Sequence, residues 1–143
     1  MASELRRLVH LDRATQADLA RAGLELGIAR LRLGSRHARA MIAASVAPTP
    51  VALLDSRQSA QVDRVAFAIP RVAARLPWRA DCLVQALAAE RWLRSQGIIA
   101  TLHFGVPRNG IAKFEAHAWL KAGDQIVTGG DIASYVALEQ KRA

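Results

Sequence analysis

The sequence predicts a single α+β domain in which an N-terminal helical region packs on a small antiparallel sheet. Two patterns predict this fold. Apolar residues recur at helical spacing through roughly the first two thirds of the chain, and a two-residue alternation follows Gly97. The 143 residues suit one domain, and a hydrophobic content of 52% supports a core. We expect residues 1–60 to form the helical region and residues 61–143 the functional core.

Two helices and a connection are expected in the N-terminal region. Thr15 can cap a helix over residues 16–33, which ends before Gly34. A second helix, over residues 35–47, is rich in Ala and Arg and stops at the first of two prolines. Because proline interrupts a helix interior, residues 48–59 are expected to form a surface connection.

Two further helices precede the strands. Apolar residues at helical spacing predict a helix over residues 62–76, with a kink or a break at Pro70. The next helix is expected over residues 82–96. Asp81 can accept hydrogen bonds from amides of its first turn, and Gly97 suits the left-handed position after its last turn. We assign Asp81 this capping role and no catalytic one.

The C-terminal part predicts three strands. Residues 98–106 are rich in β-branched and aromatic side chains, and residues 107–110 have the composition of a turn. Residues 112–121 alternate as a half-buried antiparallel strand, which a turn over residues 122–124 joins to a short strand over residues 125–128. The expected inner face of the alternating strand consists of Ala112, Phe114, Ala116, Ala118 and Leu120, and the outer face of Lys113, Glu115, His117, Trp119 and Lys121.

The composition limits the classes of function. The net charge is +8, but the arginines are scattered and aromatic residues make up only 5%, so no base-stacking surface for nucleic acid is expected. No apolar run approaches the roughly 18 residues of a membrane span, and no signal-peptide pattern begins the chain, so we expect a cytoplasmic protein. One cysteine excludes an intrachain disulfide, and the histidines lack compact ligand spacing, so neither a metal nor another cofactor is expected.

Cys82, His117 and Asp131 are the candidate catalytic residues. The thiol lies at the start of a predicted helix, where unpaired amides and the helix dipole favour the thiolate. A nearby imidazolium favours the thiolate further and can protonate a leaving amine. A third polar group usually orients the imidazole. The predicted hairpin permits Asp131 to reach His117 if Gly129 and Gly130 bulge the second strand.

Other polar residues have alternative interpretations. Asp124 can replace Asp131 as the third group, but it lies in the predicted turn, where a solvated Asp is ordinary. His103 lies on a predicted strand and is interpreted as a structural histidine. Trp119 shares the expected face of His117, and it either shields the imidazole from water or simply packs.

About sixty residues, 76–135, resemble the leader peptidases of lasso-peptide biosynthesis, often called B2 proteins, of the transglutaminase-like, papain-related cysteine protease superfamily. The matching stretches are LPWRADCLVQALAAERWLRSQGI and LHFGVPRNGIAKFEAHAWLKAGDQIVTGGD. They contain a Trp-basic segment before Cys82, a helix that ends at Gly97, a Phe-x-Ala-His-Ala-Trp strand around His117, and an acidic residue after a hairpin. The preceding helical region is similar in character only.

The resemblance implies a transglutaminase-like fold with Cys82 as nucleophile, His117 as acid and base, Asp131 as the orienting acid, and no cofactor. It implies that the enzyme cuts a leader from a ribosomally made precursor peptide. In that family a separate leader-recognition protein presents the precursor, and an ATP-dependent lasso cyclase acts next. We therefore expect the precursor and the recognition protein as partners, and the cyclase as a further one.

Two alternatives remain open at this point. The same thioester chemistry can deliver the acyl group to an amine or act on a side-chain amide, which would make the protein a transglutaminase-like acyltransferase or a deamidase. In a different class, the chain is a non-catalytic module that binds a peptide or a partner protein, with Cys82 as a buried core residue.

Overall fold

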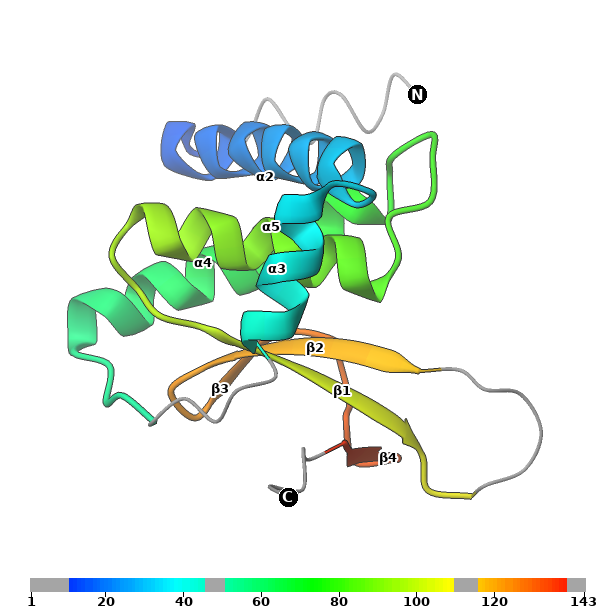
Figure 1. The fold of residues 1–143 in the computed structure, drawn as a ribbon. Coiled ribbons are helices and arrows are strands. Elements are labelled where there is room, and N and C mark those ends of the chain that lie inside the picture. The colour runs from blue at the N-terminus through cyan, green and yellow to red at the C-terminus, as the bar shows by residue number, and fades with distance from the viewer. Residues whose placement is uncertain (1–10, 46–50, 110–115, 139–143) are drawn as a thin grey trace.

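In the computed structural model, residues 11–45, 51–109 and 116–138 are described, and they form a helical layer on an antiparallel sheet (Figure 1). This arrangement confirms the predicted α+β class. The helices of the described part are α2 (Arg13–Arg32), α3 (Arg36–Ser45), α4 (Ser56–Ala73) and α5 (Cys82–Ser95). The strands are β1 (Thr101–Pro107), β2 (His117–Ala122), β3 (Gln125–Thr128) and β4 (Tyr135–Ala137).

Two helices begin earlier than predicted, and in both an aspartate caps the start. Helix α2 is capped by Asp12, whose side chain accepts a hydrogen bond from the Thr15 amide, so Thr15 is not the cap. Asp55 and Gln58 form a reciprocal capping box at the start of α4. The expected connection over residues 48–59 was therefore wrong in its second half, where the capping box starts the helix. Pro70 lies inside α4.

Buried carboxylates hold the helices together. The Glu25 side chain on α2 is 1% exposed and accepts hydrogen bonds from Arg21 and from Arg91 of α5. Asp18, also on α2, makes a two-point ion pair with Arg64 of α4, at 2.7 and 2.8 Å. Burying a carboxylate is costly unless it is paired and hydrogen-bonded, so these partners fix how α2 lies on α4 and α5.

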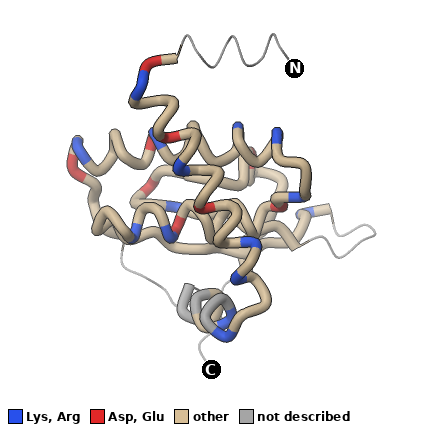
Figure 2. The backbone as a smooth tube through the Cα atoms, turned by 90° about the horizontal axis from the view of Figure 1, so that it is seen from above, with Lys and Arg blue, Asp and Glu red and all other residues tan. Residues whose placement is uncertain are grey.

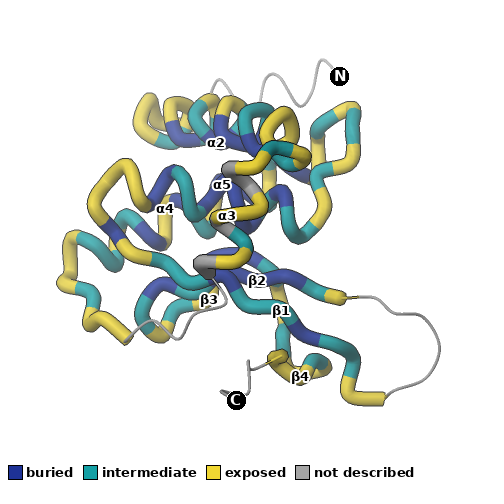
Figure 3. Tube along the Cα trace, viewed as in Figure 1, coloured by how far each residue is buried: buried dark blue, intermediate teal, exposed yellow. Residues whose placement is uncertain are grey.

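The sheet has the strand order β3-β2-β1-β4, with antiparallel neighbours. Ala118, Leu120 and Ala122 of β2 are buried in the core that α2, α4 and α5 share (Figure 3). His117, Trp119 and Lys121 alternate with them, as the sequence predicted for this part of the strand. The expected face assignments for residues 112–115 lie outside the described residues, and the assignment of Ala116 to the inner face was wrong, because Ala116 precedes β2 and is exposed.

The chain crosses the outer face of the sheet after β3. Since β3 and β4 form opposite edges of the sheet, residues 129–134 must pass beneath β2 and β1, as Figure 1 shows. Strand β4 was not predicted. Trp119 lies on this outer face, yet it is only 3% exposed. Gly129, the first residue of the crossing segment, packs so closely on Trp119 that a Cβ there would collide with it, which explains why an outer-face residue is buried.

The charged residues do not gather on one element. Figure 2 shows Lys and Arg distributed over the helices and their connections, with acidic residues between them. In the part of the chain that the structure describes, no helix combines the length and apolar character required to cross a membrane.

Gly105 gives the Trp119 indole its space. A Cβ on Gly105 would lie 2.6 Å from Trp119 Cη2 and 2.7 Å from the Val136 carbonyl oxygen, whereas a Cβ on Gly27 of α2 would meet nothing within 4 Å. We therefore expect Gly105→Ala to lower the free energy of unfolding by about 1–3 kcal/mol through overpacking. Gly27→Ala, the matched control, should raise it by about 0.5–1 kcal/mol, because glycine disfavours a helix interior. Denaturant unfolding measures both, and equal effects would contradict this packing.

Candidate active site

Cys82 is the first residue of α5 and is half-buried. Asp81 is the N-cap, as predicted, and its carboxylate accepts a hydrogen bond from the Val84 amide at 3.1 Å. The amides of Cys82 and Leu83 occupy the first two positions of the helix and lack an intrahelical partner. Within the described residues, neither amide donates a hydrogen bond to a side chain or a loop carbonyl. Two backbone donors are therefore available beside the thiol.

The segment before Cys82 is tied to the helical layer from two sides. The Arg30 guanidinium of α2 lies over the Trp78 ring at 5.0 Å and donates a hydrogen bond to the Arg79 carbonyl at 3.2 Å. From α5, the Gln85 side-chain amide donates to the Ala80 carbonyl at 2.9 Å. Side chains of α2 and α5 thus hold the segment that leads to Cys82, which restricts the position of the thiol.

Cys82 and His117 line one cleft. Its volume is about 440 Å³, and it lies between the start of α5, helix α4 and the end of β3. The other lining residues are Ala66, Pro70, Gln85, Ile126, Val127, Thr128, Gly129 and Gly130. The structure therefore brings the predicted thiol and the predicted imidazole to the same cleft from two distant parts of the chain.

The His117 ring is oriented by a main-chain carbonyl. Its Nε2 atom lies 2.7 Å from the Gly129 carbonyl oxygen. Because a carbonyl oxygen can only accept, this contact assigns the hydrogen of the neutral ring to Nε2. Nδ1 is then the nitrogen with the free electron pair, which a base requires. A backbone atom thus occupies the orienting position for which the sequence offered a carboxylate.

Asp131 lies in the same turn but contacts a different group. Continuing the Leu120–Thr128 pairing by three residues would set Asp131 opposite His117. The ladder ends at Thr128, because Gly129 and Gly130 have φ values of 107° and 63° and turn the chain away. The exposed Asp131 carboxylate accepts a hydrogen bond from the Ala133 amide at 2.9 Å. A direct contact between Asp131 and His117 stays a prediction.

Gly129 cannot be replaced by a larger residue without a rearrangement. Its φ of 107° is unfavourable for residues with a Cβ, and a Cβ there would collide with Trp119 Cβ. The register shift in the hairpin falls between Leu120 and Lys121, before the two glycines rather than at them. The glycines therefore turn the chain out of the sheet, and they do not form the bulge that would let Asp131 reach His117 along the strand.

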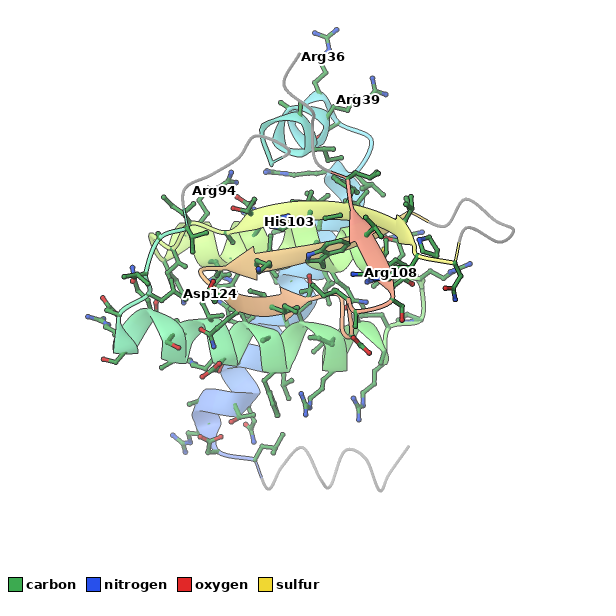
Figure 4. The ribbon with its side chains drawn as sticks, turned by 90° about the horizontal axis from the view of Figure 1, so that it is seen from below. Arg36, Arg39, Arg94, His103, Arg108 and Asp124 are labelled. Carbon is green, nitrogen blue, oxygen red and sulfur yellow. The ribbon has the colours of Figure 1, made fainter. Side chains whose placement is uncertain are left out.

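An aromatic row extends from His117 across the outer face of the sheet. Tyr135 of β4 stacks on the imidazole with 4.6 Å between ring centroids, and Trp119 lies tilted at 6.1 Å. At the other end of the row, the His103 ring stacks on Trp119 with 5.9 Å between ring centroids. Figure 4 shows His103 on the outer face of β1. Burial, and to a lesser extent the nearby Lys121 charge, lower the pKa of His103. These contacts agree with a structural role for His103.

Sequence reasoning missed two of these groups. Tyr135 lies beyond the segments with clear periodicity, and its three-residue strand is too short to show alternation. The Gly129 carbonyl is a backbone group, and the only sequence signal for it was the Gly-Gly pair. Asp124, the alternative acid, is exposed in the β2–β3 turn and is drawn there in Figure 4. Within the described residues, no cluster of three potential ligands suggests a metal site.

A cysteine at a helix start and a histidine from an adjoining sheet, both facing one cleft, define the general arrangement of cysteine-dependent acyl-transfer enzymes. A family model of the transglutaminase-like superfamily matches residues 7–140, so the chain belongs to this superfamily. The superfamily is typically enzymatic and cysteine-dependent, and it includes peptidases and acyltransferases. Comparisons with curated proteins and with solved structures found no match.

The tautomer of His117 distinguishes the carbonyl from the carboxylate as the orienting group. We expect ¹⁵N NMR of the neutral ring to show Nε2–H in the native protein and in Asp131→Asn, because the Gly129 carbonyl accepts from the same atom in both. Asp131→Ala should also keep the tautomer, but lose about 0.5–1.5 kcal/mol of stability with the Ala133 hydrogen bond. A switch to Nδ1–H in Asp131→Asn would show that the carboxylate sets the ring.

Proposed function

We propose that this protein is a cysteine peptidase that removes the leader from a ribosomally made, lasso-type precursor peptide. The observation that supports the proposal best is the cleft that Cys82 and His117 share, within a transglutaminase-like domain. The resemblance of residues 76–135 to lasso leader peptidases supplies the substrate class. Gly129 and Gly130 line the cleft without side chains, which leaves room for an extended peptide beside them.

In the proposed first step, the Cys82 thiolate attacks the scissile carbonyl carbon. The carbonyl π electrons move to oxygen, and the amides of Cys82 and Leu83 stabilise the oxyanion that forms. When the tetrahedral intermediate collapses, the C–N bond breaks and the imidazolium of His117 gives a proton to the departing amine. With Nε2 held by Gly129, the proton leaves from Nδ1. The products are a thioester on Cys82 and the core peptide with a free amino terminus.

In the second step, water resolves the thioester. His117 removes a proton from the water through Nδ1, the hydroxide adds to the acyl carbon, and Cys82 leaves as a thiolate. The leader leaves as a carboxylic acid that gives its proton to solvent, while His117 keeps the proton taken from water and is ready for the next cycle. The same thioester in the presence of a bound amine would give acyl transfer, the chemistry of the superfamily's other members.

The proposal includes two partners. A separate leader-recognition protein holds the leader near the cleft, since the implied reaction depends on presentation of the precursor. The ATP-dependent cyclase uses the amine that cleavage releases. Asp131 remains our proposed third catalytic residue by resemblance, and its present contact with the Ala133 amide shapes the turn that carries the Gly129 carbonyl.

Mass spectrometry of a lasso precursor incubated with the protein and the recognition protein tests this function. We expect cleavage at one leader–core junction, and a loss of at least about 10³-fold in rate in Cys82→Ala and in His117→Ala. Asp124→Asn, an exposed turn residue outside the cleft, serves as the matched control and should cleave at the native rate. Joining of the acyl group to an added amine would favour the acyltransferase, and full activity of Cys82→Ala would contradict the mechanism.

A further inference from the structure

A second cavity, of about 540 Å³, is lined by residues of the crossing segment and of strands β1, β2 and β4 or their ends. Trp119 and Tyr135 form two of its walls, Ile132 and Ala133 of the crossing segment line it, and Arg108 contributes a cation. Its lining residues differ from those of the Cys82 cleft, so it is a separate feature of the molecule.

The second cavity adjoins the histidine side of the proposed active site. His117 lines the cleft with Cys82, and its ring contacts both aromatic walls of the second cavity, Tyr135 at 4.6 Å and Trp119 at 6.1 Å. In the proposed reaction the departing amine receives its proton from His117. The half of the peptide that carries this amine must therefore pass the imidazole, whose ring lies against two residues that line the second cavity.

Arg108 is held in place but retains donors for a ligand. Its Nε atom donates to the Ala133 carbonyl at 2.9 Å, and its amide donates to the Ser134 carbonyl at 2.9 Å. Figure 4 shows Arg108 beside β4 on this face. Among the described residues, no carboxylate lies within ion-pair distance of its guanidinium. Two terminal nitrogens thus remain, and an anchored guanidinium of this kind suits a carboxylate.

We propose that this cavity binds an acidic side chain on the leaving-group side of the scissile bond, and that Arg108 determines this specificity. The aromatic and aliphatic walls fit the methylene groups of Glu, and the Arg108 guanidinium at the cavity pairs with the carboxylate. The assignment to the leaving-group side rests on the proposed function, while binding of a carboxylate at Arg108 does not require catalysis.

The test is an NMR titration of the ¹⁵N-labelled Cys82→Ala protein, which cannot cleave, with the peptide Ac-Ala-Ala-Glu-Ala-Ala-NH2. Its capped ends leave the Glu carboxylate as the only anion. We expect the Trp119 indole and Arg108 Nε–H signals to shift saturably. The Gln counterpart should bind at least about 10-fold more weakly, because it loses charge-assisted hydrogen bonds.

Two arginine variants complete the experiment. Arg108→Gln should bind both peptides equally, and Arg39→Gln should keep the native preference, because Arg39 is exposed on α3, away from β4 (Figure 4). The proposal would be overturned if the Cys82→Ala protein with Arg108 intact bound both peptides equally, if neither peptide shifted the signals, or if the preference for Glu survived Arg108→Gln. Failure of the precursor to be cleaved would instead count against the peptidase function, and would leave the preference for Glu intact.

Discussion

The hydrogen bond from His117 to the Gly129 carbonyl fixes the geometry on which the site depends, and it requires a specific backbone path. The ladder between β2 and β3 must end at Thr128, and two successive glycines must adopt positive φ values. On this path the Gly129 carbonyl accepts a hydrogen bond from the His117 ring and takes no part in strand pairing with β2. The same turn directs the chain across the outer face, where Tyr135 stacks on the ring and the crossing segment buries Trp119. One turn thus provides the orienting acceptor and the aromatic support of the proposed base.

The proposed nucleophile depends on a different set of contacts. Cys82 begins α5 because Asp81 caps the helix, and the segment before it is held by Arg30 and Gln85. Helix α5 is in turn attached to α2 through the buried Glu25 and Arg91. The thiol and the imidazole therefore belong to the two layers of the domain, and the packing of α5 on β2 brings them to one cleft. A small shift of α5 relative to the sheet would change the distance between the Cys82 thiol and the His117 ring while leaving the fold the same.

Much of this structure follows from local patterns in the sequence. The α5 cap at Asp81, the left-handed Gly97 and the bounds of β3 are short-range features, and all were predicted. The early start of α4 was missed because the prolines at 48 and 50 outweighed the Asp55 capping box that follows them. Strand β4 and the Gly129 carbonyl were missed for a different reason. Each acquires its role from a partner distant in the sequence, and a three-residue strand or a backbone atom leaves no periodic signal.

The rate at which iodoacetamide alkylates Cys82, the only thiol, tests the central claim most directly when it is measured against pH in the native protein and in His117→Asn. We predict that the native thiol is alkylated at least about 10-fold faster than the thiol of His117→Asn near neutral pH, because the start of α5 and the nearby imidazole favour the reactive thiolate. An inert thiol, or a profile that the His117 variant leaves unchanged, would contradict the account of Cys82 and His117 as a catalytic pair.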